Sequence, residues 1–186
     1  LKVSKRRLGY KFKKVTNKQD YVNKPINKIL RQRFARVYTE ELWRGKRIFN
    51  IDESAIATSD NRSMSWIKTK SGIALLPQRL SGRTLIACIG SDGSLFSAVL
   101  KGQLNEVVFY YYLSRLAQQL DIHYSNWRKD IVLLLDNCTS HVSKITQWFM
   151  TTMNIPVCFT GPASYKIVPV ELLFGSLKSG RIVVGD

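Results

Sequence analysis

Cysteine, histidine and long apolar runs are all scarce in this chain of 186 residues. Its three cysteines are far apart and form no Cys-x-x-Cys pair: Cys88, Cys138 and Cys158. This spacing excludes a disulfide scaffold, and with only His123 and His141 beside it argues against a structural zinc site. The longest apolar runs, such as 131–135, are far too short to cross a bilayer. The composition therefore predicts an intracellular protein without a membrane anchor.

Acidic residues are scarce as well: 13 Asp and Glu stand against 29 Lys and Arg, a formal net charge of +16. The excess is concentrated at the start of the chain. Residues 1–47 hold 16 Lys and Arg against 3 acidic residues, whereas residues 48–186 hold 13 against 10. A basic segment on a nearly neutral body indicates a nucleic-acid partner, because each neutralised phosphate releases counterions. A ribosomal-type protein and a patch for anionic membranes remain the alternatives.

The apolar content is that of a folded domain, with 45% hydrophobic residues. Helical spacing and capping residues predict helices at 25–43, 105–120, 142–153 and 169–178. Strand-like runs occupy 47–51, 64–68, 83–90, 94–100, 131–135 and 155–159, with a hairpin turn at 91–93. Strands followed by alternating helices and strands predict an α/β fold, a mixed sheet flanked by helices.

Two aspartates directly follow apolar strands: Asp52 ends the run at 47–51, and Asp136 ends the run at 131–135. The carboxyl ends of central strands in an α/β sheet meet in one crevice, so these side chains are expected to converge. Two carboxylates beside a dry core repel each other and require a cation, and Mg²⁺ suits them because it prefers oxygen ligands. Glu171, in the first turn of the final helix, would complete the set. Three carboxylates can hold two metal ions roughly 3.5–4 Å apart, the geometry for in-line attack on a phosphodiester.

Each of these acids also has a structural interpretation. An Asp at a strand end, such as Asp52, is commonly a turn former or a helix N-cap. Asp136 can form an Asx-type turn, and Glu171 near a helix start is stabilised by the helix dipole without any metal. Glu53 should point to the opposite face of its strand from Asp52 and serve a structural role. The order and spacing of the three acids favour the metal site.

Three motifs carry a resemblance to a known family. Residues 49–54 (FNIDES) read as an apolar strand ending in Asp-Glu-Ser, and residues 133–141 (LLLDNCTSH) as one ending in Asp-Asn with a later His. Residues 169–178 (PVELLFGSLK) place Glu two residues after Pro, followed by an aromatic residue and Leu-Lys. In these motifs the chain resembles the mariner-type transposases, and the 34 residues between the second and third acids are typical of their Asp–Asp–Glu branch. Trp66 and Gly72 resemble the stretch that follows the first motif.

The resemblance implies a ribonuclease-H-like fold and a cut-and-paste transposase that cleaves and transfers DNA strands. Asp52, Asp136 and Glu171 would be the catalytic residues and the ligands of two Mg²⁺ ions, with Mn²⁺ as a substitute. Asn137 and His141 would support these ligands or face the DNA. The implied partners are double-stranded DNA, as transposon ends and target, and a second copy in a homodimer assembled on DNA. In a eukaryote such a protein would act in the nucleus.

The basic residues 1–16 resemble the end of a helix-turn-helix unit, with a solvated linker as the alternative. DNA contacts are expected from six of its side chains: Lys5, Arg6, Arg7, Lys11, Lys13 and Lys14. Phosphate contacts of this kind position a protein without choosing a sequence. Residues 17–47 then form a basic linker and helix, and residues 48–186 the catalytic domain. That domain is expected to be truncated at its C-terminus, because family members usually continue with further helical sequence.

Two other functions fit the sequence. A catalytically decayed transposase would keep the fold and the basic arm as a DNA-binding protein. The loop before Glu171 favours this alternative, because it has fewer prolines than the family pattern and carries Val168 where Asn is usual. A different ribonuclease-H-like enzyme would act instead on RNA–DNA hybrids or Holliday junctions. Metal titration and a comparison of cleavage on these substrates would separate the three functions.

Overall fold

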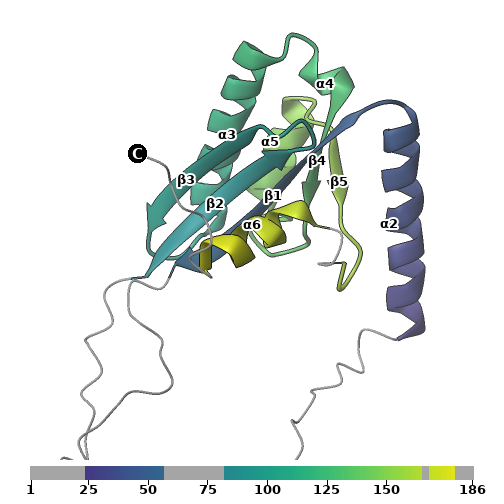
Figure 1. Cartoon of the computed structure of the whole chain (residues 1–186), viewed down its shortest axis with the longest axis horizontal. Helices are drawn as coiled ribbons and strands as arrows, with labels where there is room; N and C mark the ends of the chain where they lie inside the picture. The colour runs from purple at the N-terminus through teal and green to yellow at the C-terminus, as the bar shows by residue number, and fades with distance from the viewer. Residues whose placement is uncertain (1–23, 57–81, 165–167, 179–186) are drawn as a thin grey trace, which may run out of the picture.

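A five-stranded mixed sheet organises the computed structural model, which describes residues 24–56, 82–164 and 168–178 (Figure 1). The strand order is β3-β2-β1-β4-β5. Strand β1 pairs antiparallel with β2 and parallel with β4, so the antiparallel and parallel halves of the sheet meet at β1. The predicted mixed sheet is confirmed. The strands are β1 (Arg47–Ile56), β2 (Arg83–Gly90), β3 (Leu95–Lys101), β4 (Ile131–Leu135) and β5 (Val157–Phe159).

Four of the helices lie close to their predicted positions, whereas the short helix at Trp127–Asp130 was not predicted. The Asn105 side chain accepts a hydrogen bond from the Val108 N–H at 2.9 Å, so Asn105 caps the helix that follows it, as predicted. Ser143 caps the next long helix through the Thr146 N–H, which starts that helix later than the pattern predicts. The helices are α2 (Pro25–Trp43), α3 (Glu106–His123), α4 (Trp127–Asp130), α5 (Lys144–Thr152) and α6 (Pro169–Lys178).

Strand β1 is longer than the sequence pattern predicts. The pattern ends the strand at Ile51, whereas β1 continues to Ile56. The cause is β2, whose antiparallel ladder with β1 runs past the point where β4 stops. Asp52 therefore does not follow the strand, as predicted, but lies inside it opposite Ala87. It lies two residues past Asn50, the last β1 residue that pairs with β4.

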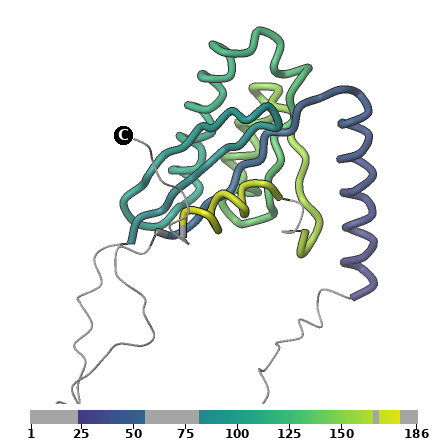
Figure 2. The backbone as a smooth tube through the Cα atoms, in the orientation of Figure 1, coloured from purple at the N-terminus to yellow at the C-terminus, as the bar shows by residue number. Residues whose placement is uncertain are grey.

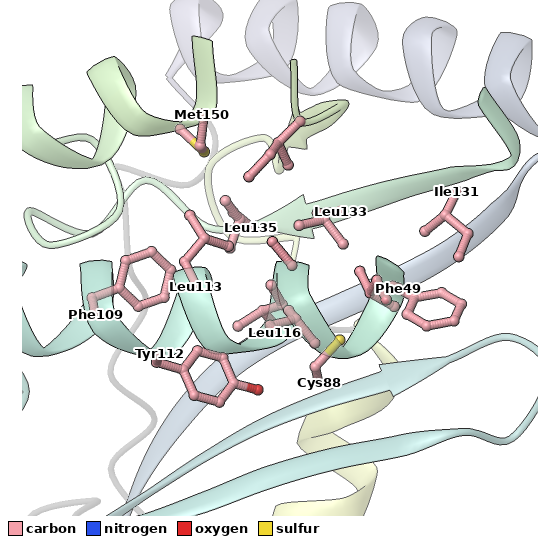
Figure 3. Packing of buried hydrophobic residues seen from close by; sticks show 14 of the residues in the cluster. Phe49, Cys88, Phe109, Tyr112, Leu113, Leu116, Ile131, Leu133, Leu135 and Met150 are labelled. Atoms are coloured by element: carbon pink, nitrogen blue, oxygen red, sulfur yellow. The ribbon is translucent and has the colours of Figure 1, made fainter. Parts of the chain in front are cut away.

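The larger core lies between the sheet and helices α3 and α5. Alternation along β1 sends Phe49 and Ile51 to this face, and Leu133 joins them from β4. Figure 3 shows Phe109 and Leu113 of α3 in the same cluster. All five side chains are at most 1% exposed. This packing holds β1 and β4 side by side and so fixes the residues at the ends of their shared ladder.

The opposite face of the sheet carries α2 and α6, which Figures 1 and 2 show away from α3 and α5. Helix α6 packs Val170 and Phe174 against the β2 residues Leu85 and Ala87. Phe34 of α2 packs with apolar side chains of β1, β4 and β5. Because side chains alternate along a strand, the polar β1 residues at positions 50 and 52 also face this side.

Helix α2 is attached through few contacts. Phe34 is its only buried residue, and the other apolar residues of its helical spacing are between 38% and 46% exposed: Ile29, Leu30, Val37 and Leu42. A close backbone approach provides a second contact. A Cβ atom at Gly161, in the loop after β5, would lie 2.9 Å from the Cα atom of Arg31. Glycine therefore lets this loop lie directly against the helix.

Several sequence expectations concern residues outside the described ranges. They are the strand at 64–68, Trp66, Gly72 and the basic arm with its six DNA contacts at Lys5, Arg6, Arg7, Lys11, Lys13 and Lys14. Within the described ranges, no helix has both the length and the apolar character needed to cross a membrane.

Candidate active site

The three acids singled out in the sequence line one cavity. Asp52, Asp136 and Glu171 all contribute to the wall of a space of about 840 Å³, with Asn50 and Asn137 beside them. They come from β1, from the residue after β4 and from the first turn of α6. Asp52 is half-buried, whereas Asp136 and Glu171 are exposed. The structure thus brings the predicted set together in a place that solvent and ligands can reach.

The parallel register of β1 and β4 places the two aspartates next to each other. Asn50 pairs with Leu134 in this ladder, and two further steps along each chain lead to Asp52 and Asp136. Because β4 ends at Leu135, the chain leaves the sheet at Asp136. The two carboxylates therefore emerge at the same end of neighbouring strands, as the sequence predicts.

Asn50 connects the sheet to the helix that carries the third acid. Its side chain is 1% exposed and makes two hydrogen bonds. Its Nδ2 donates to the Leu134 carbonyl at 3.2 Å, and its Oδ1 accepts from the Val170 N–H at 3.1 Å. One amide thus satisfies both a carbonyl of β4 and a free N–H at the start of α6. This bridge holds the first turn of α6, and with it Glu171, over the end of the sheet.

Asp52 is the acid whose ionisation is most strongly opposed. Burial is the largest cause and raises its pKa to about 7 from the ordinary 3.8, and the negative charges of Glu53, Asp136 and Glu171 act in the same direction. The Glu53 N–H, which donates to Asp52 Oδ1 at 2.8 Å, opposes the rise only in part. Crowded carboxylates of this kind, facing an open cavity, suit a hard divalent cation that binds oxygen. The donor set fits Mg²⁺ or Mn²⁺.

Without divalent cations, we expect the free energy of unfolding to fall as the pH rises from 4.5 to 6.5 because of Asp52. The folded state keeps the Asp52 proton up to a pKa of about 7, while the unfolded chain loses it near 3.8. After allowance for solvent screening of this half-buried group, the loss is on the order of 1–2 kcal/mol. Urea denaturation across this range measures it.

The matched variant for this pH effect is Asp52→Asn, in which the fall attributed to Asp52 should disappear. The window stops at pH 6.5 because His141, whose pKa is raised, begins to lose its own stabilising contribution above its ordinary value of 6.5. Equal pH dependence in the parent and in Asp52→Asn would show that Asp52 does not carry the charge crowding.

Asp136 is held by the segment that follows it. Its Oδ1 accepts a hydrogen bond from the Cys138 N–H at 3.0 Å and lies 2.7 Å from His141 Nδ1. Burial opposes the ionisation of Asp136, but the contacts with His141 and Cys138 outweigh burial and hold its pKa below the ordinary range. Asp136 is therefore charged and oriented before any cation arrives. The contact with Cys138 is of the Asx type, so Asp136 makes the predicted turn contact and also lines the cavity.

His141 is a fully buried link between two acids. Its Nε2 lies 3.2 Å from Glu53 Oε2, an ion-pair distance, although no hydrogen bond joins these two atoms. Its ring lies 4.2 Å from the ring of Phe109, between centroids. Burial would lower the pKa of His141, but its contacts with Asp136, Cys138 and Glu53 outweigh this and raise it to about 12. His141 therefore carries a positive charge between Asp136 and Glu53 at neutral pH.

Glu53 and Asn137 also have defined positions. Glu53 lies on the other face of β1 from Asp52, as alternation predicts, and meets His141 there. The Asn137 Nδ2 donates to the Thr160 carbonyl at 2.7 Å, which ties the end of β4 to the end of β5. Asn137 also lines the cavity. Both residues thus fix the two strand ends that frame the site.

Basic residues of α2 stand next to the carboxylates. Arg33 is exposed and contributes to the wall of the same cavity. Arg31, two residues earlier in the same helix, donates a hydrogen bond to the Pro162 carbonyl at 3.3 Å. A cavity wall that carries both a positive side chain and several carboxylates suits a phosphate-bearing ligand with bound cations.

Sequence reasoning missed two of these residues and the contact of a third. An amide inside an apolar strand was a usable signal for Asn50, because a buried polar group needs partners. Alternation gave the face of Glu53 but not its contact with His141. Cys138 lines the cavity and neighbours both side chains, and no motif in the sequence indicated this.

Solved structures share this fold. The Mos1 transposase paired-end complex with left transposon end matches with a TM-score of 0.67 and 21% identity, over 96% of this chain and 56% of that chain. The Mos1 mariner paired end complex with Mn matches with 0.68 and 20%, over 95% and 56%. The catalytic domain of Mos1 mariner transposase matches with 0.61 and 16%, over 92% and 75%. The ribonuclease-H-like fold is confirmed, and the chain spans little more than half of the chains in the two complexes.

A family model gives the other match. The model described as DDE superfamily endonuclease matches residues 47–182, which is most of the chain and includes the three acids. No curated protein sequence matches the chain.

Proposed function

Because the chain belongs to the DDE superfamily endonuclease family, we propose that it is the catalytic core of a transposase that cleaves and transfers DNA strands with divalent cations. The expected resemblance to mariner-type transposases is confirmed by this family and by the similarity to Mos1. The observation that carries the proposal is the convergence of Asp52, Asp136 and Glu171 on one cavity.

The proposed metal ligands are Asp52, Asp136 and Glu171, holding two Mg²⁺ ions with Mn²⁺ as a substitute. The support is their shared cavity and the charge crowding at Asp52. Solved Mos1 complexes are described with Mn and with Mg. When bound, such cations activate the attacking water or 3′-hydroxyl and stabilise the leaving oxygen.

The protein's own part is to hold three acids from different elements in one arrangement. His141 and Cys138 orient Asp136. Strand β1 fixes Asp52 through its pairing with β2, and Asn50 fixes the first turn of α6, which carries Glu171. Each acid is therefore placed by a different element, and the reacting groups need little reorganisation.

The proposed partner is double-stranded DNA, as transposon ends and target. The matched Mos1 structures include complexes with transposon ends and a strand transfer complex. The basic arm at 1–16 would contact phosphates through Lys5, Arg6, Arg7, Lys11, Lys13 and Lys14, and α2 would continue this path to the cavity through Arg33. Assembly as a homodimer on DNA, and action in the nucleus of a eukaryotic host, belong to the same proposal.

A plasmid assay tests the proposal. Incubation of the chain with supercoiled plasmid and Mn²⁺ or Mg²⁺ should produce open circles, and chelation of the metal should stop their formation. The same protein should cleave linear duplex in preference to an RNA–DNA hybrid or a four-way junction. DNA binding without cleavage under any metal would instead identify a decayed transposase.

We expect Arg33→Ala to weaken DNA binding several-fold and to reduce the salt dependence of binding by about one phosphate contact. The exposed Arg33 contributes to the wall of the cavity, where its guanidinium could meet a phosphate. Fluorescence anisotropy of a labelled duplex, titrated at several salt concentrations, measures both effects.

The control for this variant is Arg115→Ala, which removes an exposed arginine from α3 on the other side of the sheet. That change should leave affinity and salt dependence near those of the parent. Equal loss in both variants would point to overall charge and would remove Arg33 from the proposed DNA path.

A further inference from the structure

A cluster of three different ligand types lies beside the carboxylate site, which is the set of Asp52, Asp136 and Glu171. A carboxylate, a thiol and an imidazole, from Glu53, Cys138 and His141, offer ligand atoms that all lie within 4.8 Å of one another. Cys138 Sγ is 3.7 Å from Glu53 Oε1, and His141 Nε2 is 3.2 Å from Glu53 Oε2. The cluster joins β1 to the loop after β4, on the other face of the sheet from Asp52.

These separations are close to those between ligand atoms around a tetrahedral metal ion. With metal–sulfur bonds of about 2.3 Å and metal–nitrogen or metal–oxygen bonds of about 2.0–2.1 Å, neighbouring ligand atoms lie about 3.3–3.5 Å apart. The measured separations run to different Glu53 oxygens, 3.2 Å from His141 Nε2 to Oε2 and 3.7 Å from Cys138 Sγ to Oε1, and the three ligand atoms all lie within 4.8 Å of one another. An ion could therefore bind after rotation of the Glu53 carboxylate and small movements of the other two side chains toward one another.

The imidazole is oriented for such a role. His141 is fully buried, and its Nδ1 lies 2.7 Å from Asp136 Oδ1. Its Nε2 faces the cluster and, within the described residues, neither it nor Glu53 Oε2 has a hydrogen bond. A carboxylate on one imidazole nitrogen with a metal on the other is the arrangement that commonly supports histidine ligands.

We propose that Glu53, Cys138 and His141 form a second cation site, selective for zinc-like ions and distinct from the carboxylate site. The thiolate and imidazole prefer Zn²⁺ and Co²⁺, whereas Mg²⁺ prefers oxygen ligands. Binding releases the Cys138 thiol proton and the His141 Nε2 proton to solvent. Cys138 lines the open cavity, which gives the ion a route in and leaves a fourth position for water.

Occupancy of this site would act on the neighbouring acid. The ion would withdraw Glu53 and His141 from their ion pair while His141 Nδ1 stays on Asp136. Zinc-like ions would therefore change the electrostatic surroundings of an acid in the proposed active site without displacing it. An ion bound at the second site would thereby regulate the metal-dependent activity of the proposed active site.

Titration of the purified chain with Co²⁺ tests the site by absorption spectroscopy, without any nuclease assay. A tetrahedral site with one thiolate should give intense visible bands and a sulfur-to-cobalt charge-transfer band. Zn²⁺ should abolish both in a one-to-one ratio, and excess Mg²⁺ should not. Cys138→Ser should remove the charge-transfer band and weaken Zn²⁺ binding at least about 100-fold, since a ligand is lost rather than a supporting group.

Two sets of variants serve as controls. Cys88→Ser, at a buried thiol outside the cluster, and Asp52→Asn and Glu171→Gln, at the carboxylate site, should keep the cobalt spectrum. Circular dichroism establishes that each variant is folded. Octahedral bands alone in the parent, without tetrahedral bands, or a charge-transfer band that survives Cys138→Ser, would overturn the proposal. Neither result bears on DNA cleavage, so the transposase proposal is tested separately.

Discussion

Asp136→Asn should lower metal-dependent DNA cleavage by at least about 10³-fold, equivalent to about 4 kcal/mol of transition-state stabilisation. Asparagine keeps the shape of the side chain and an oxygen that can accept from the Cys138 N–H and His141. It removes the negative charge that a divalent cation requires. The fold and the affinity for DNA should therefore remain, and only turnover should be lost. Single-turnover nicking of supercoiled plasmid, beside anisotropy measurements of binding, separates the two quantities.

The matched control is Asp130→Asn, the same chemical change at an exposed position of α4. It should cleave like the parent. If Asp136→Asn nicked plasmid as fast as this control, the assignment of the three acids would lose its support. Loss of DNA binding together with cleavage would instead indicate a folding defect, and the melting temperature of the variant would reveal it.

The sequence was sufficient wherever the signal was local. The five consecutive apolar residues of β4 predicted its bounds, because only a strand buried on both faces has this composition at this length. Asn105 predicted the start of α3, since the cap is a contact between residues three apart. The convergence of Asp52 and Asp136 followed from parallel strands, whose carboxyl ends meet at one edge.

The missed features depend on contacts between distant residues. The length of β1 is set by its ladder with β2, which is a separate segment of the sequence. The residue pattern within β1 alone does not give this pairing. Asn50 acts on α6 through Val170, 120 residues later, so its role exists only once the helix has docked. The apolar spacing of α2 predicted the helix correctly but not how little of it the sheet covers.

The arrangement of acids in the site lowers the stability of the fold, and specific contacts of neighbouring residues offset part of this loss. Asp52 resists ionisation because of burial and three nearby acids. Against this, His141 stabilises Asp136, and Asn50 satisfies two backbone groups at the point where α6 meets the sheet. A substitution in these supporting residues should therefore affect both folding and chemistry, whereas substitution of a cavity acid should affect mainly chemistry.

We expect Asn50→Ala to reduce the free energy of unfolding by about 2–4 kcal/mol, because it removes two buried hydrogen bonds and leaves the Val170 N–H without its partner. The first turn of α6 should shift, and a shift of Glu171 by about 1 Å should lower cleavage by about 10²-fold. The Mg²⁺ concentration needed for half-maximal cleavage should rise as well. Urea denaturation and a metal titration of plasmid nicking measure these effects.

Asn105→Ala provides the comparison, because it also removes one asparagine–backbone hydrogen bond, but at the cap of α3 away from the cavity. It should cost about 1 kcal/mol of stability and leave the metal dependence of cleavage unchanged. Both variants are assayed at a temperature where circular dichroism shows them folded. A change in stability without any change in metal dependence would make Asn50 a structural residue only. A rise in the Mg²⁺ requirement confined to Asn50→Ala would show that the amide positions Glu171, because loss of stability alone leaves the geometry of the folded molecules intact.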